Sequence, residues 1–154
     1  SERHNFSIIG TTNRPSDLDF AFYRPGRFYP VIYMGPPNAA VREEILRIYA
    51  EKYGIADKLN IKDLAARTDG FTGAHLKEIF DSAKHTAILS KAKDISGIRN
   101  LSNPDEVDIR LEDINAYVSD NKARIKKNLD EWESTFSAFF KKDKFEGAVV
   151  NMFG

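Results

Sequence analysis

The chain has 154 residues, of which 42% are hydrophobic and 30% charged, so it is long and apolar enough to fold around one core. Its 23 basic residues balance its 23 acidic ones, which argues against a nucleic-acid-binding surface, and the absence of cysteine excludes disulfides and thiolate metal sites. No apolar run approaches the ~20 residues of a membrane span, and nothing at Ser1 resembles a signal peptide. We therefore expect a protein of the cytoplasm or another reducing intracellular compartment.

The first predicted element is a buried strand that leads to a ligand-binding turn. The apolar run at 6–9 is followed by Gly10-Thr11-Thr12, a pattern that predicts a parallel strand delivering Asn13 to the carboxyl edge of a sheet. Open α/β sheets bind ligands at that edge, and an amide there can orient a water toward a phosphate. The alternative is that Asn13 is an ordinary turn former.

Two arginines follow on a predicted tight turn. Arg24 and Arg27 flank Pro25 and Gly26, which stiffen and turn the chain, so that two planar guanidinium groups can meet phosphate oxygens. On this pattern alone, solvated surface arginines are the better interpretation.

The pattern then changes from strand to helix. The apolar run 29–34 predicts a second strand, and the stiff Gly-Pro-Pro link at 35–37 predicts a hinge. Apolar residues at helical spacing predict helices over 39–53, 73–93 and 111–125, a short helix after Asn60 that ends by Gly70, and a loop over 94–108. We expect Asn38, Asn60 and Thr72 to be N-caps.

A stripe of large apolar side chains comes near the end of the chain. Its members fall at helical spacing and are Leu129, Trp132, Phe136, Phe139 and Phe140. Such a face must be covered, and we expect it to pack against the preceding helices; docking on a neighbouring subunit or a partner is the alternative. The apolar stretch 145–154 has no clear period.

Together these motifs resemble the AAA family of ATPases. Asn13 falls where the family has its sensor 1 asparagine, and Arg24 and Arg27 fall where it has paired arginine fingers. Residues 69–76, Asp-Gly-Phe-Thr-Gly-Ala-His-Leu, are similar to the sensor 2 segment of the subgroup in which alanine replaces the sensor arginine. The likeness covers roughly residues 6–125.

The resemblance also implies nucleotide-binding residues. Gly73 and Ala74 are expected near the adenine of the nucleotide; the alternative is that they only let a helix begin close to a neighbouring backbone. Tyr49 takes a position where many relatives have a histidine near the base, although an aromatic side chain on an apolar helix face is also a core candidate. His75 stands where the family has aspartate, which we expect to weaken the helix cap. No metal ligand is assigned, because the three histidines are scattered.

The fold class that this resemblance implies is α/β followed by all-α. We expect the last two parallel strands of a P-loop αβα sheet, with Ile8 and Ile9 beside Val31 and Ile32, and then a helical-bundle lid subdomain. The expected divisions are the end of the αβα subdomain at 1–35, the lid at 36–127, and a carboxyl-terminal helix with an apolar tail at 128–154.

The implied function is that of part of a ring-forming ATPase. The sequence contains neither the phosphate-binding G-x-x-x-x-G-K-[ST] loop nor an apolar strand ending in Asp-Glu, so we expect a fragment that is inactive alone. The intact protein would use ATP and Mg²⁺ in a homo-oligomeric ring, usually a hexamer, to remodel a protein substrate, with Asn13 acting in cis and the arginines in trans. Neither nucleic acid nor a membrane is an expected partner. The alternative is a non-catalytic helical interaction or assembly module.

Overall fold

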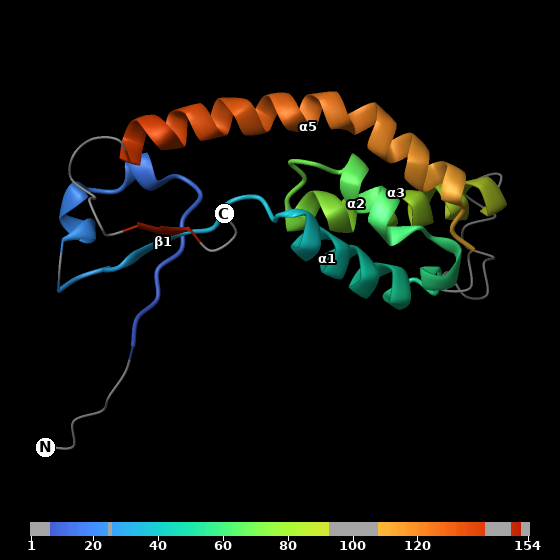
Figure 1. Ribbon diagram of the computed structural model, residues 1–154, viewed down its shortest axis with the longest axis horizontal. Helices are drawn as coiled ribbons and strands as arrows, with labels where there is room; N and C mark the ends of the chain where they lie inside the picture. The colour runs from blue at the N-terminus through green and yellow to red at the C-terminus, as the bar shows by residue number, and fades with distance from the viewer. Residues whose placement is uncertain (1–6, 25, 93–107, 141–148, 152–154) are drawn as a thin grey trace, which may run out of the picture.

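The computed structural model describes residues 7–24, 26–92, 108–140 and 149–151, with the backbone alone at 135, 137–140 and 149–151. In chain order its elements are η1 Pro15–Asp17, η2 Phe20–Tyr23, β1 Val31–Tyr33, α1 Ala39–Lys52, η3 Ala56–Lys58, α2 Ile61–Arg67, α3 Gly73–Ala92, α5 Leu111–Phe140 and β2 Val149–Asn151. A helical lobe holds α1, α2 and α3, a smaller lobe holds η1, η2 and the strands, and α5 extends over both (Figure 1).

The helices begin at the predicted polar caps. Asn38 accepts a hydrogen bond from the Val41 N–H, and Asn60 accepts one from the Asp63 N–H, both at 3.1 Å. The hydroxyl oxygen of Thr72 accepts a hydrogen bond from the His75 N–H at 3.4 Å, at the start of α3. Each cap satisfies a donor that the helix itself leaves unpaired, and the three cap predictions are confirmed.

The hydrophobic core lies between the helices of the helical lobe and the first half of α5. Phe71 and Phe80 are its largest fully buried side chains. The members of the core are Leu46, Ala50, Ile55, Leu64, Ala65, Phe71, Leu76, Ile79, Phe80, Ala83, Ile109, Ile114, Val118 and Ile125. The mostly helical architecture that was expected after residue 36 is thus present, and the helical periodicity correctly selects the inward faces of α3 and α5.

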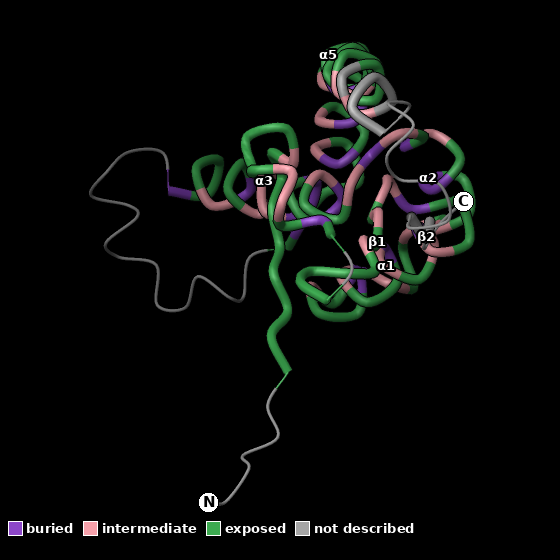
Figure 2. The backbone as a smooth tube through the Cα atoms, turned by 90° about the vertical axis from the view of Figure 1, so that its left-hand side faces the viewer, coloured by how far each residue is buried: buried purple, intermediate pink, exposed green. Residues whose placement is uncertain are grey.

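The strand pairing differs from the prediction. β1 pairs in parallel with β2, in the register Val31↔Val149, Ile32↔Val150 and Tyr33↔Asn151. Residues 7–12 form no strand, and the side chains of Ile8 and Ile9 are 69% and 89% exposed. Residues 7–14, which follow the grey amino-terminal end, are coloured as exposed in Figure 2. The predicted pairing of the Ile8–Ile9 segment with β1 is therefore wrong in this structure, in which that segment forms no strand and β2 is the strand that pairs with β1.

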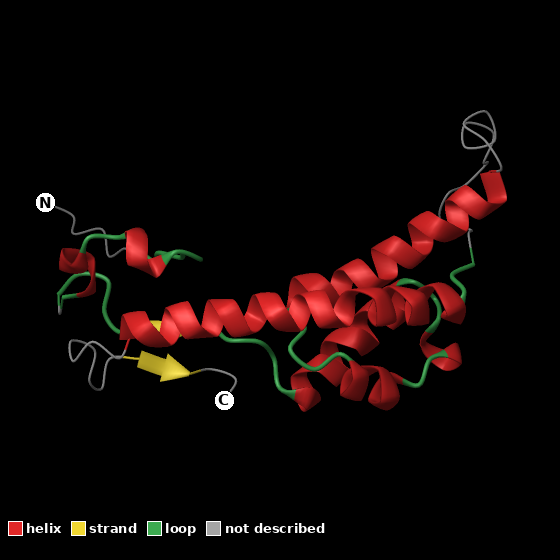
Figure 3. Ribbon diagram, turned by 90° about the horizontal axis from the view of Figure 1, so that it is seen from above, coloured by secondary structure: helices red, strands yellow, loops and turns green. Residues whose placement is uncertain are grey.

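Helix α5 joins the lobes. The segments 111–125 and 129–140, inferred separately from the sequence, form one continuous helix that runs along the helical lobe and reaches the small lobe (Figure 3). The predicted loop at 94–108 lies outside the described residues except for Asp108, which is in neither a helix nor a strand. In the described part of the chain, no helix is long and apolar enough to cross a membrane.

The apolar stripe of α5 is covered in a different way from the one expected. Trp132 stacks on Tyr33 of β1, with ring centroids 5.7 Å apart and ring planes 16° apart, and the Phe136 ring lies 4.3 Å from the Tyr33 ring. The stripe therefore packs partly on the small lobe, not only on the preceding helices. The side chains of Phe139 and Phe140 lie outside the described residues.

We predict that Trp132→Ala detaches the small lobe from α5 and leaves the helical lobe folded, because neither Trp132 nor Tyr33 belongs to the core. Hydrogen exchange and limited proteolysis should show faster exchange and cleavage within residues 7–34, with unchanged protection in α3. Ser134→Ala, at an exposed position on the same helix, is the matched control. Loss of protection throughout α3 would contradict the prediction.

Candidate functional site

A cavity of about 510 Å³ lies where the link 35–37, α1, the start of α3 and α5 meet. Val41 and Ile45 of α1 and Leu129 and Trp132 of α5 supply apolar walls. Polar side chains in the wall are Thr72, His75 and Asn128. An apolar cavity with a few polar groups is the usual form of a small-molecule site, so we take this as the candidate site.

The start of α3 borders this cavity. Gly73 lines it and is exposed, and a Cβ placed on this glycine would have no heavy atom within 4 Å. Ala74 is the next residue of the helix and is also exposed. The two predicted nucleotide-binding residues thus form the exposed first turn of a 20-residue helix, beside the cavity.

His75 takes part in the cap that it was expected to weaken. The Thr72 N–H donates to His75 Nδ1 at 3.3 Å, and the His75 N–H donates back to Thr72 Oγ1 at 3.4 Å. Thr72 Oγ1 also lies 3.1 Å from Nδ1. This is the reciprocal arrangement of a capping box, with an imidazole nitrogen in place of a carboxylate; the weaker cap expected from this exchange stays a prediction. Burial lowers the pKa of His75; Glu78 opposes this shift and Arg124 adds to it.

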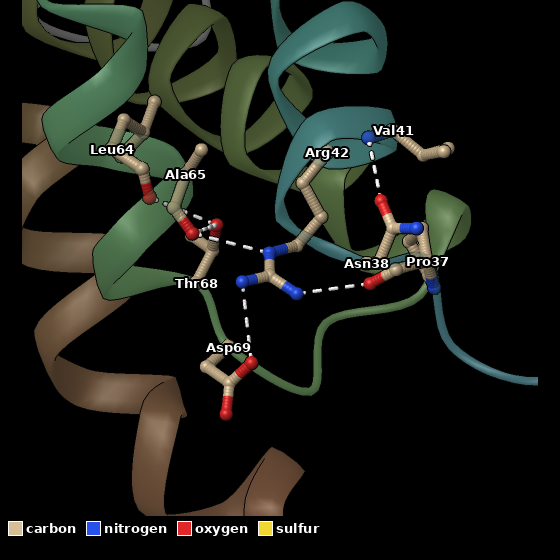
Figure 4. A network of polar contacts seen from close by, with 8 residues as sticks. All are labelled: Pro37, Asn38, Val41, Arg42, Leu64, Ala65, Thr68 and Asp69. Carbon is tan, nitrogen blue, oxygen red and sulfur yellow. Dashed lines mark hydrogen bonds and ion pairs between the residues drawn. The ribbon is translucent and has the colours of Figure 1, made fainter. Parts of the chain in front are cut away.

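A buried arginine, which sequence reasoning missed, connects the parts around the cavity. Arg42 is 5% exposed. Its Nε donates to the Ala65 carbonyl at 3.1 Å, its Nη1 donates to the Pro37 carbonyl at 2.9 Å, and its Nη2 lies 3.2 Å from the Asp69 carboxylate (Figure 4). The link, the end of α2 and the turn before α3 therefore meet on one guanidinium. Its position four residues before Leu46, on the buried face of the predicted helix, was the available signal.

Asn13 lies in the small lobe. It is exposed and lines two cavities, of about 520 and 450 Å³, together with Pro15, Trp132 and Phe136. Because 7–12 is not a strand, Asn13 is not held at a sheet edge in this structure.

The two arginines lie on the turn that was predicted. The Arg27 N–H donates to the Arg24 carbonyl at 3.1 Å, and Gly26 has φ +87°, which a residue with a side chain rarely adopts. Both arginines are exposed, and Arg27 Nη1 donates to the Ala21 carbonyl at 3.1 Å. Neither lines the cavities at Asn13 or the one at Gly73. The structure therefore does not bring the arginines together with the other predicted site residues.

Tyr49 lies on the core side of α1. It is half-buried, its ring centroid lies 5.9 Å from that of Phe80, and it does not line the cavity at Gly73. Its contact with a nucleotide stays a prediction. Within the described residues, no group of three or more His, Cys, Asp or Glu side chains could hold a metal ion.

Comparison with known proteins gives close relatives for about half of the chain. An ATP-dependent zinc metalloprotease FtsH 2 of Symbiobacterium thermophilum is 46% identical over 81 residues, which are 53% of this chain and 14% of the relative. A proteasome-activating nucleotidase of Methanocaldococcus jannaschii is 43% identical over 86 residues, which are 56% of this chain and 20% of the relative. No family model and no solved structure matches the chain.

These relatives are AAA ATPases, so over about half of its length the chain is homologous to that family, and the resemblance shown by its motifs is confirmed. The chain spans only 14% and 20% of the length of the two relatives named above.

We predict that Arg42→Met lowers the free energy of unfolding by about 1–3 kcal/mol, because the Pro37 carbonyl loses its guanidinium donor and the Ala65 carbonyl keeps only the Thr68 hydroxyl. Asp69→Asn should cost less than about 1 kcal/mol, because the Asp69 side chain is 80% exposed. Urea denaturation of both variants measures the two costs. Equal losses would mean that the ion pair, not the two carbonyl bonds, carries the stabilisation.

Proposed function

We propose that this chain is the carboxyl-terminal part of an AAA ATPase module that couples ATP hydrolysis in a ring, usually hexameric, to the remodelling of a protein substrate. The observation that carries the proposal is the cavity at Gly73, because it lies between the link 35–37 and the segment 69–76, whose motif resembles the family's sensor 2 segment. A lid that moves in response to nucleotide would need to contact the nucleotide at this cavity.

The proposed roles follow the matched motifs. Gly73 and Ala74, at the first turn of α3, contact the adenine, because residues this small permit close approach of the backbone. Asn13 acts in cis and orients the attacking water. Arg24 and Arg27 act in trans on the γ-phosphate held by the neighbouring subunit, and their exposure on a turn supports such a role.

We also propose that other parts of the protein supply the phosphate loop and the ligands of Mg²⁺, since the sequence contains neither motif. The proposed divisions remain 1–35, 36–127 and 128–154. The last two share α5, which continues through the boundary between them.

We predict that the isolated 154-residue chain has no ATPase activity above the buffer rate and binds ATP weakly or undetectably. The phosphate loop and the magnesium ligands supply most nucleotide contacts in such enzymes. A coupled phosphate-release assay and calorimetry with Mg²⁺-ATP measure the two quantities. Turnover by a purified sample would show that the fragment interpretation is wrong.

In the full-length protein, Arg24→Ala or Arg27→Ala should lower kcat by roughly 10²-fold and leave ATP binding nearly intact, because two arginines share a role worth about 10³–10⁵-fold in related chemistry. Arg47→Ala, an exposed arginine on α1, is the matched control and should hydrolyse ATP normally.

Mixing separates the trans role from a structural one. Subunits with Arg24→Ala and an intact phosphate loop should regain hydrolysis beside subunits with intact arginines and an inactive phosphate loop. If mixed rings form and never regain activity, the trans role fails and the alternative of an interaction module gains.

A further inference from the structure

The cap of α3 uses an acceptor that protonation can remove. The Thr72 N–H can only donate, and it donates to His75 Nδ1, so this nitrogen must be without a proton and the neutral ring must carry its proton on Nε2. A carboxylate would accept the same bond at any pH above about 4. An imidazolium places two donors face to face and adds a positive charge at the positive end of the helix dipole.

The surroundings of His75 favour the neutral ring. His75 is half-buried, and the edge of its ring contacts that of Phe71, with the planes at 72°. The charges that act on it are Glu78 on its own helix and Arg124 on α5, which packs against α3. The link 35–37 and α1 contribute only glycine, proline, valine and isoleucine residues to the cavity wall, and none of these is titratable. Among the described residues that line the cavity, His75 is the one titratable group.

We propose that His75 is a positioning residue that controls the start of α3: its neutral ring fixes Gly73 and the first turn beside the cavity, and its protonation opens the cap. The consequence for nucleotide binding rests on the proposed function; the opening of the cap does not.

The direction of the pH effect follows from the lowered pKa. Because folding lowers the pKa of His75, the folded state favours the neutral ring. The stabilisation from the cap is therefore complete above the unfolded value of about 6.5, and it is lost as the pH falls from there through the lower folded value.

Nuclear magnetic resonance of the whole 154-residue chain tests the cap directly. At neutral pH the imidazole nitrogen signals should show a bare Nδ1 and a protonated Nε2, and on acidification the Thr72 amide should shift with the same midpoint as the His75 ring. Thr72→Val, which has the same shape and lacks the hydroxyl, should shift that midpoint, because Thr72 Oγ1 lies 3.1 Å from His75 Nδ1. His85 is an exposed histidine on the same helix, and His85→Asn should change neither the nitrogen signals of His75 nor the midpoint of the Thr72 amide shift.

His75→Asp is the decisive variant, because it replaces the titratable acceptor by a carboxylate. Protection of the Leu76 amide against hydrogen exchange, corrected for intrinsic rates, should fall by roughly 3- to 30-fold in the wild type between about pH 7 and pH 5, as expected for loss of a cap, and should stay level in His75→Asp. Equal losses in both proteins, or a protonated Nδ1 at neutral pH, would overturn the proposal.

The link to nucleotide is tested in the full-length protein. The wild-type KM for ATP should rise by roughly 3- to 30-fold more than that of His75→Asp when the pH is lowered from about 7.5 to 5.5, with kcat changing equally in both. If ATP is hydrolysed and the two KM profiles coincide, the nucleotide consequence is overturned. If the full-length protein neither binds nor hydrolyses ATP, the proposed function fails, while the result for the cap stands on the resonance data.

Discussion

The buried guanidinium of Arg42 is the interaction on which the arrangement around the cavity depends. A cation removed from water must find partners, and here these are the carbonyls of Pro37 and Ala65 and the carboxylate of Asp69. Ala65 is in the last turn of α2, where carbonyls have no partner within the helix backbone and the helix dipole is negative, so its carbonyl suits a cation. One side chain thus holds the link, the end of α2 and the turn before α3 in a fixed relation.

Helix α5 supplies a second connection between the same parts. A Cβ on Gly70 would lie 3.0 Å from a methyl group of Leu129, so the turn next to Asp69 is in close contact with this helix, and one turn further on Trp132 stacks on Tyr33 of β1. These contacts form a closed ring around the cavity. The link connects β1 to α1, and Arg42 of α1 binds Asp69 in the turn before α3. Gly70 in that turn contacts Leu129 of α5, and α5 returns to β1 through Trp132. A change in the angle of the link must therefore disturb either the arginine bonds or the aromatic stack.

Local patterns predicted the helical lobe well, and long-range pairing was not predictable in the same way. Asn38 and Asn60 cap helices because their side chains reach amides three residues away, and such a contact is visible in the sequence. The partner of β1 is more than a hundred residues further along the chain, and nothing in the apolar run 29–34 distinguishes pairing with 149–151 from pairing with Ile8 and Ile9. The candidate site shows the same difference between local and long-range structure. The turn at Gly26 was predictable from neighbouring residues, whereas the partners of Arg42 depend on how α1, α2 and the link pack together.

His75 shows how one substitution can change the control of a site and preserve its geometry. The capping box requires an acceptor that reaches back over three residues, and imidazole Nδ1 and a carboxylate oxygen both satisfy it. The two differ in charge: a carboxylate would add a favourable anion to the helix end, whereas a neutral imidazole adds none and becomes repulsive when protonated. Since Thr72 and His75 both line the cavity, the acceptor that orders this end of α3 also determines the charge of the cavity wall. The same exchange that keeps the helix start in place thus makes its stability depend on pH, in a range where the aspartate of the family would not titrate.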